Sequence, residues 1–341
     1  MIAFALSRLV RLAAVLIAIT IVSFGFIHGI QGDPVAIRLG DHSTPEQAAA
    51  LRSSLGLDEP WFVQLARYLG ALLHGDLGSS IFDQQPIVTK LEQHFPATVE
   101  LSLAALVFAV FIGIPIGIVA AVRHRSLIDS LASSLALLGV SVPIFWLGYM
   151  LVLASQALAH VLGIREIFPV SGGQIAIGTY VPARTHLVVV DALLAGNAAA
   201  AGDALRHLVL PAVTLGTIPL AIIAKITRGE MLEVLHSDYI RTARAKGLAF
   251  RAVVLRHALR SALIPIITIV GLQAGLLLGG AILTENVFAW PGVGRLAFDA
   301  VGDRDFPLIN GCILLFASVF VIVNVAVDLL YAVANPRIRY G

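Results

Sequence analysis

Long apolar blocks, separated by shorter polar stretches, dominate this chain of 341 residues. Six of the blocks have about the 20 residues that a helix needs to cross a hydrocarbon core roughly 30 Å thick. Their apolar residues run on continuously instead of alternating with polar ones, so lipid contacts much of their surface. The pattern predicts an all-α polytopic membrane protein with spans at about 10–30, 98–122, 131–162, 208–226, 263–284 and 307–333.

The third and fourth predicted spans are irregular. The third, 131–162, is long for one crossing, so we expect it either to tilt or to continue into the outer compartment. The fourth is short and contains Pro211 and Pro219. Spans tolerate such prolines where neighbouring helices satisfy the carbonyls that a proline leaves free.

The first apolar block has two interpretations, because Arg8 and Arg11 precede it as basic residues precede the core of a signal peptide. The block is longer than a usual signal-peptide core, and no cleavage site of the Ala-x-Ala kind precedes Gly32. We therefore expect a retained first membrane helix.

The lysine and arginine residues indicate how the spans are oriented. With the N-terminus inside, 14 of the 23 fall on the cytoplasmic side, although the outer segments are longer. This bias agrees with the positive-inside rule and predicts that both termini are cytoplasmic. Eight of the 14 lie in one cytoplasmic loop, residues 225–262: Lys225, Arg228, Arg241, Arg244, Lys246, Arg251, Arg256 and Arg260.

Two outer segments are long enough to hold structure of their own. In residues 31–96, where acids outnumber bases eight to four, apolar residues recur at helical spacing and predict an amphipathic helix: Trp61, Phe62, Leu65, Tyr68, Leu69 and Leu72. Residues 163–207 are rich in glycine and alanine, with a helix-like stretch near 191–205. The chain thus divides into residues 1–96, the first span with its outer segment, and residues 97–335, a five-span core.

Composition narrows the class further. The chain is 58% hydrophobic and 13% charged, with a mean hydropathy of +0.91. An ordinary soluble domain carries about 25% charged residues. The net charge of +2 gives no case for nucleic-acid binding. The single cysteine, Cys312, lies in an apolar run and is expected to be a small buried hydrophobe.

Motifs for catalysis are not found in the sequence. It contains no His-Glu-x-x-His zinc motif and no Gly-Lys dipeptide, so it lacks the phosphate-binding loop of a P-loop ATPase. Ser141 is followed by Val142 and Pro143, which breaks the Gly-x-Ser-x-Gly pattern of hydrolases. Acids in the predicted spans are few, and Asp328 is the chief one. A proton-coupled carrier would need more of them. We expect no enzyme activity, no cofactor and no metal site.

Gly271, Gly275 and Gly279 recur every four residues along the fifth predicted span. On a helix they form one smooth stripe at which another helix can approach closely. The partner helix belongs either to the same chain or to another subunit, and the sequence leaves both open.

The cytoplasmic loop 225–262 contains a second, shorter helix signal. Asp238 is placed to cap the N-terminus of a helix, and Arg244 and Lys246 suit the negative end of its dipole. Gly247 then ends the helix, because glycine readily takes the left-handed conformation found there. By charge alone, a solvated connector would fit equally well.

The amino-acid sequence of this loop resembles that of a known protein family. Residues 238–248 read Asp-Tyr-Ile-Arg-Thr-Ala-Arg-Ala-Lys-Gly-Leu, with His257-Ala-Leu-Arg and Pro265 downstream. This resembles the so-called EAA loop of peptide-class ABC importer permeases, most closely their dipeptide-transport branch. Further matches cover nearly the whole chain: Gly32-Asp33-Pro34, Leu55–Asp58, Gly75–Gly78, Ser141–Trp146, Gly216–Leu220, Glu285–Gly292, Asp328–Tyr331 and Asn335-Pro336-Arg337.

The resemblance implies a type I ABC importer permease in a bacterial inner membrane, surrounded by lipid. Its partners would be a second homologous permease, two cytoplasmic ATPases and a periplasmic peptide-binding protein. The loop residues that would couple to an ATPase are Asp238, Tyr239, Arg241, Ala243, Arg244, Lys246, Gly247 and His257. The general pattern has Glu-Ala-Ala where this chain has Arg241-Thr242-Ala243, so no role of that glutamate carries over.

Two alternatives to a peptide importer remain open at this stage. A secondary carrier driven by an ion gradient would need intramembrane acids and broken helices in corresponding halves of the chain, and neither is evident. The same permease class could also carry another cargo, such as glutathione or a metal chelate.

Overall fold

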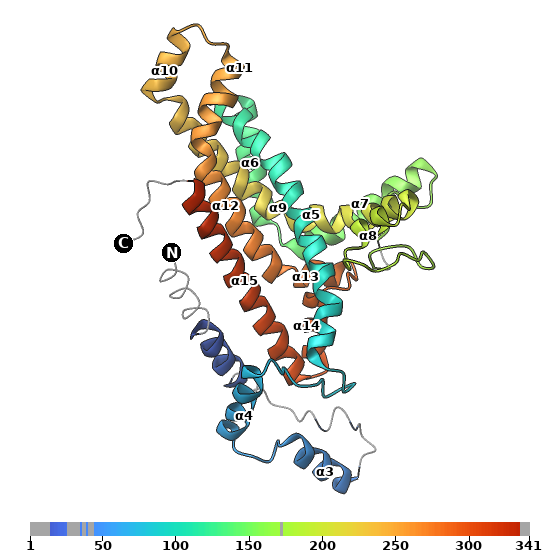
Figure 1. Ribbon diagram of the computed structural model, residues 1–341. Helices are drawn as coiled ribbons and strands as arrows, with labels where there is room; N and C mark the ends of the chain where they lie inside the picture. Colours follow the sequence, from blue (N-terminus) through green and yellow to red (C-terminus); the bar gives the residue numbers. More distant parts are fainter. Residues whose placement is uncertain (1–13, 26–34, 36–38, 40–43, 171–172, 335–341) are drawn as a thin grey trace.

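The computed structural model describes residues 14–25, 35, 39, 44–170 and 173–334, which form helices joined by turns and loops (Figure 1). The predicted all-α polytopic architecture is confirmed. Parts of the first predicted span, the terminal residues 335–341 and the side chain of Asp328 lie outside the described residues. Five described helices are long and apolar enough to cross a membrane: Ile87–Val122, Ile144–Leu162, Ala198–Leu235, Phe250–Gly279 and Phe306–Val327.

Two shorter apolar helices, Ala14–Gly25 and Leu127–Ser141, accompany these five. The labelled elements of Figure 1 follow in chain order: α3 (Pro45–Leu55), α4 (Trp61–Leu73), α5 (Ile87–Val122), α6 (Leu127–Ser141), α7 (Ile144–Leu162), α8 (Val188–Leu194), α9 (Ala198–Leu235), α10 (Asp238–Ala245), α11 (Phe250–Ala252), α12 (Leu259–Gly280), α13 (Ile282–Val287), α14 (Val293–Gly302) and α15 (Phe306–Ala334). A π-helical turn, Val253–Ala258, joins α11 to α12.

The helices α5 and α9 form the closest pair in the bundle, and glycines make this possible. A Cβ on Gly113 would lie 2.9 Å from the Leu220 carbonyl oxygen, and one on Gly117 would lie 2.6 Å from that of Ala224. On the facing helix, a Cβ on Gly216 would lie 2.7 Å from a carbonyl oxygen of α5. The two backbones therefore touch at three levels, as small residues allow in membrane helices.

The third predicted span, 131–162, is wrong as a single crossing. The chain forms two helices there, α6 and α7, separated at Val142 and Pro143. Val142 is extended, at φ −80° and ψ 128°. A residue before proline is pushed out of the helical region by the proline ring, which explains the break. In Figure 1, α7 lies with α8 at one side of the bundle.

The fourth predicted span, 208–226, is only the middle of α9, which has 38 residues. At 1.5 Å per residue α9 is about 57 Å long, well beyond the thickness of a hydrocarbon core. Pro211 and Pro219 both lie inside it. The helix-like stretch predicted near 191–205 is divided between α8 and the start of α9 by a turn at Gly196, which has φ 69°.

Buried polar groups fasten the corner between α13 and α14 to α5. The Glu285 side chain is fully buried and accepts hydrogen bonds from the Thr98 hydroxyl at 2.8 Å and from the Arg295 backbone N–H at 2.9 Å. The indole N–H of Trp290 donates to the Ala97 carbonyl at 2.8 Å. Burial raises the pKa of Glu285, and the hydrogen bonds from Thr98 and Arg295 only partly oppose this shift.

Carboxylates also hold the segment 173–207, which was predicted to lie outside. Glu100 of α5 accepts hydrogen bonds from the Gln174 side chain at 2.7 Å and from the Val189 backbone N–H at 2.8 Å. Asp191 of α8 accepts from the backbone N–H groups of residues 184–186. The Glu100 carboxylate is thus engaged in joining the segment to the bundle.

Replacing Gly117 by valine should separate α5 from α9. Forcing bulk into a packed interior costs roughly 1–3 kcal/mol, and here the obstacle includes a backbone carbonyl that cannot rotate away. We expect a lower thermal unfolding midpoint of the purified chain in detergent. Gly202→Val is the matched control, because Gly202 is exposed on α9 with no described atom within 4 Å of a Cβ. Equal midpoints for the two variants would contradict the prediction.

Candidate functional site

The loop between α9 and α12, predicted to be cytoplasmic, is shorter than the predicted range, 225–262. Helix α9 continues to Leu235, and the next long helix begins at Phe250. Between them lies α10, which Figure 1 shows at one extreme of the molecule, beyond the ends of α6 and α9. The fifth predicted span, 263–284, covers the rest of this long helix, which ends at Gly280, and the start of α13 (Ile282–Val287).

The start of α10 differs by one position from the prediction. Ser237 is the N-cap, in an extended conformation, and its hydroxyl donates to the Val234 carbonyl at 2.6 Å instead of capping α10. Asp238 is the first helical residue and forms an ion pair with Arg241 one turn later. A carboxylate in the first turn still suits the positive end of the helix dipole.

The end of α10 has the conformation expected from the sequence. Gly247 has φ 77°, and its N–H donates to the Arg244 carbonyl at 3.0 Å. The Leu248 N–H donates to the Ala243 carbonyl at 3.4 Å. No described atom lies within 4 Å of a Cβ built on Gly247, so its backbone conformation is what favours glycine there.

One face of α10 packs on its own chain and the other is exposed. Ile240 and Ala243 are buried in an apolar cluster that includes Val253 and Ala258 of the π-helical turn. The exposed face carries Tyr239, with 47% of its surface accessible, together with the other residues of the predicted coupling set: Asp238, Arg241, Arg244, Lys246 and Gly247. Ala243 is therefore a packing residue that seats the helix.

Contacts with the following helix hold the exposed face in place. The Tyr239 hydroxyl donates to the Ser261 hydroxyl oxygen at 2.8 Å. The Arg244 guanidinium lies 5.6 Å from the centre of the Phe250 ring, a cation–π distance. His257 lies in the π-helical turn and is half-buried. The sequence analysis did not predict this π-helical turn, a feature that often marks functional positions in helices.

A buried ion pair, absent from the sequence prediction, joins the α5–α6 turn to α9. Asp129 is 5% exposed, and its carboxylate accepts hydrogen bonds from Arg228 at 2.5 and 2.9 Å. The Arg125 backbone N–H adds a third at 2.9 Å. Hydrogen bonding to Arg228 holds the pKa of Asp129 far below its usual range. The pattern Ser126-x-x-Asp129 before an apolar run is a helix-start signal that could have drawn attention to Asp129.

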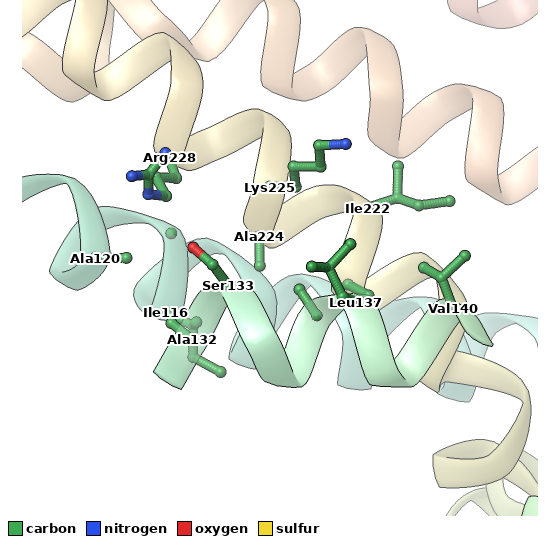
Figure 2. Close-up of a pocket in the computed structure, with 13 residues that line it drawn as sticks. Ile116, Ala120, Ala132, Ser133, Leu137, Val140, Ile222, Ala224, Lys225 and Arg228 are labelled. Carbon is green, nitrogen blue, oxygen red and sulfur yellow. The ribbon is translucent and has the colours of Figure 1, made fainter. Parts of the chain in front are cut away.

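Beside this ion pair, a cavity of about 340 Å³ separates α6 from α5 and α9. Figure 2 shows Leu137 and Val140 of α6 on one side and Ile222 of α9 on the other, with Arg228 at one end. Small side chains such as Ala120 and Ala132 leave the space open. Helix α6 is therefore joined to α9 by an ion pair at its N-terminal end, while a cavity separates the two helices along part of their length.

Two glycines of the predicted stripe pack against the same chain. A Cβ on Gly271 would overlap Val327 of α15, and one on Gly275 would lie 3.5 Å from the Phe320 ring. No described atom lies within 4 Å of a Cβ on Gly279. Gly271 and Gly275 therefore contact a helix of the same chain, α15, which is one of the two alternatives that the sequence left open.

Comparison with known families decides what kind of protein carries this loop. The family described as "binding-protein-dependent transport system inner membrane component" matches residues 113–340, and the corresponding N-terminal family matches residues 1–104. The chain belongs to this family. It is a multi-pass inner-membrane component of a transport system, and α9, α10 and α12 all lie within the first match.

Curated relatives match over the full length. The dipeptide transport system permease protein DppB of Alkalihalophilus pseudofirmus is 46% identical over 340 residues, which cover 100% of both chains. The protein of the same name from Escherichia coli K12 is 45% identical over 344 residues, covering 100% of this chain and 99% of the relative. The glutathione transport system permease protein GsiC of Salmonella paratyphi A is 38% identical over 340 residues, covering 100% of both chains. The resemblance to peptide-class ABC permeases is confirmed.

Removing the arginine of the buried ion pair should destabilise this permease. Arg228→Met leaves the Asp129 carboxylate buried without its partner, and breaking a buried pair from one side costs about 3–5 kcal/mol. We expect a clear drop in the thermal unfolding midpoint in detergent. Arg251→Met, at an exposed position of α11, serves as the control and should leave the midpoint nearly unchanged. A small effect of Arg228→Met, equal to the control, would show that the pair contributes little.

Proposed function

We propose that this chain is a pore-forming permease subunit of an ABC importer that carries dipeptides across the inner membrane. The observation that carries the proposal is 45–46% identity, over the full length, to two dipeptide permeases. The glutathione permease is 38% identical over the same length. Dipeptides are therefore the preferred cargo, ahead of glutathione or a metal chelate.

The proposed assembly contains a second, homologous permease, two cytoplasmic ATPases and a periplasmic peptide-binding protein. Membership of a binding-protein-dependent transport family supports the last two kinds of partner. In the proposed orientation both termini and α10 are cytoplasmic and residues 31–96 are periplasmic. The placement of 14 of the 23 basic residues supports this orientation.

In the proposed mechanism, α10 docks into a cleft of an ATPase and transmits the movement of that ATPase to the membrane-spanning helices. Helix α9 leads directly into the loop that carries α10, and α5 moves with α9 because their backbones touch at Gly113 and Gly117. The Asp129–Arg228 pair adds the cytoplasmic end of α6 to the same moving unit. Closure of the two ATPases would thereby turn the pore outward, with the permease acting as a two-state element.

A secondary carrier is the competing function. Such a protein needs acids that bind or release an ion within the membrane. Glu100, in the second predicted span, is already bonded to the Gln174 side chain and the Val189 backbone. Its hydrogen bonds support a structural role and leave the importer as the better proposal.

Uptake by a strain that lacks this gene would test the proposed cargo. We expect the strain to lose uptake of a labelled dipeptide and to regain it with the wild-type chain. Excess unlabelled dipeptide should compete strongly in the complemented strain, and excess glutathione weakly. Strong competition by glutathione but not by dipeptide would identify glutathione as the cargo. Uptake that persists without ATP would favour the ion-driven secondary carrier.

Gly247→Val tests whether α10 is the ATPase-docking element. At φ 77° a residue with a Cβ loses roughly 1 kcal/mol, and a β-branched residue loses more. We expect normal membrane levels, loss of ATPase co-purification and loss of dipeptide uptake. Arg244→Glu should weaken docking less, since an exposed charge pair contributes about 1 kcal/mol or less. Gly229→Val, at an exposed glycine of α9, is the matched control. Wild-type uptake with Gly247→Val would make the loop a simple connector.

A further inference from the structure

A second cavity, of about 300 Å³, lies at the opposite end of the bundle from α10. It is enclosed by the first described helix, by α4, by residues 77–81 and by the first turn of α15. Its lining is mostly apolar and includes Phe24, Leu77, Ile81 and Phe306. Helix α4 has no buried residue, although its sequence is apolar, so the space between it and α15 is incompletely filled by the described chain.

Two buried polar atoms among the cavity's lining residues have no hydrogen-bond partner among the described groups. Asn310 is 4% exposed and its Oδ1 atom is unpaired, and the Tyr68 hydroxyl is unpaired as well. Burial raises the pKa of Tyr68 to about 12, so the phenol is protonated at neutral pH. An unpaired buried polar group costs about 1–3 kcal/mol, and native proteins seldom leave one without a partner.

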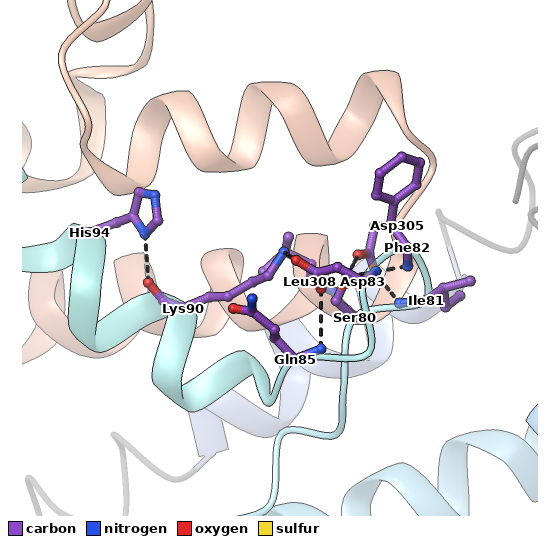
Figure 3. Close-up of polar contacts among 9 residues, drawn as sticks. All are labelled: Ser80, Ile81, Phe82, Asp83, Gln85, Lys90, His94, Asp305 and Leu308. Atoms are coloured by element: carbon purple, nitrogen blue, oxygen red, sulfur yellow. Dashed lines mark hydrogen bonds and ion pairs between the residues drawn. The ribbon is translucent and has the colours of Figure 1, made fainter. Parts of the chain in front are cut away.

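The wall of the cavity is held in place by bonds that do not involve Asn310 or Tyr68. Figure 3 shows the Asp305 carboxylate receiving the Ser80 hydroxyl and the Ile81 backbone N–H, the latter at 3.2 Å. Nearby, the Lys90 ammonium lies 2.7 Å from the Asp83 carboxylate. The site is therefore built before any occupant arrives.

The two unpaired atoms define the chemistry of an occupant. The amide oxygen Oδ1 of Asn310 needs a donor, and the oxygen of the Tyr68 phenol can accept a hydrogen bond as well. A hydroxyl has one hydrogen to donate, whereas a primary ammonium has three and can serve both atoms. The stacked rings of Phe24 and Tyr68, with centres 6.1 Å apart, offer a π surface that suits a cation.

The position of the cavity indicates where such an ammonium comes from. The apolar part of α15 begins at Phe306, so Asn310 lies about one turn inside the membrane-crossing segment. This is the depth at which lipid head groups meet polar side chains. Arg67 also stands among the lining residues; its side chain is 60% exposed and its guanidinium is paired with the Glu59 carboxylate at 2.6 Å.

We propose that this cavity binds the head group of an aminophospholipid, with the ammonium donating to Asn310 and Tyr68. The lipid fills the space between α4 and α15 and fastens the outer N-terminal segment to the span. This role is separate from cargo transport and does not depend on which cargo the permease carries.

The test compares phosphatidylethanolamine with phosphatidylcholine, which has the same phosphate but no N–H donor. The full chain, in detergent with equal amounts of the two lipids of matched acyl chains, is analysed by native mass spectrometry. We expect the wild type to retain phosphatidylethanolamine about tenfold better, equivalent to about 1.4 kcal/mol. Tyr68→Phe, which removes one oxygen, and Asn310→Leu should each abolish most of this preference.

Asn324→Leu is the matched control, because this second asparagine of α15 is bonded to the Phe320 carbonyl at 2.9 Å and lies outside the cavity lining. It should retain the wild-type preference. Equal retention of the two lipids by the wild type would overturn the proposal and assign ordered water to the unpaired atoms. A preference that survives in both Tyr68→Phe and Asn310→Leu would also overturn it, because the lipid would then bind elsewhere.

Discussion

The contact between the backbones of α5 and α9 is the constraint on which the rest of the permease depends. Without side chains at Gly113, Gly117 and Gly216, carbonyl oxygens of one helix can approach the Cα atoms of the other. In lipid, where apolar surface gains little from burial, such close van der Waals contact is a main source of helix association. The other long helices arrange themselves around this pair. A displacement of the end of α9 next to α10 would therefore also displace α5.

Carboxylates have a common task elsewhere in the bundle. Asp129, Glu285 and Asp305 are each nearly or fully buried, and each accepts hydrogen bonds from a different segment of the chain. Each acid stands at a corner where helices meet, and its two oxygens can receive several donors at once. A hydrophobic residue could fill the same volume without joining the segments. The cost of burying a charge is offset by these donors, which is how an apolar protein can use acids as connectors.

The sequence predicted the class of protein, the approximate positions of most long apolar segments and the end of α10. These depend on local or compositional properties: continuous apolar runs, and the ease with which Gly247 takes φ 77°. The break at Pro143 also had a local cause, but the apolar run across it concealed the change of direction. The Asp129–Arg228 pair and the three-glycine contact join residues about 100 positions apart. No periodicity within one helix reveals such partners. The regularly spaced glycines of α12 form a recognisable pattern because they share one helix. Gly113, Gly117 and Gly216 form no such pattern because they are divided between two helices.

The π-helical turn at Val253–Ala258 sets the rotation of α12 relative to the loop that carries α10. A π turn accommodates one residue more than an α turn, and one residue corresponds to about 100° of rotation around an α-helix. Val253 and Ala258, which pack in one apolar cluster with Ile240 and Ala243 of α10, lie within this turn. A loop taken from a permease with an uninterrupted α-helix would therefore present a different side of the helix to α10. Exchange of such loops between related transporters is limited by rotation as well as by sequence.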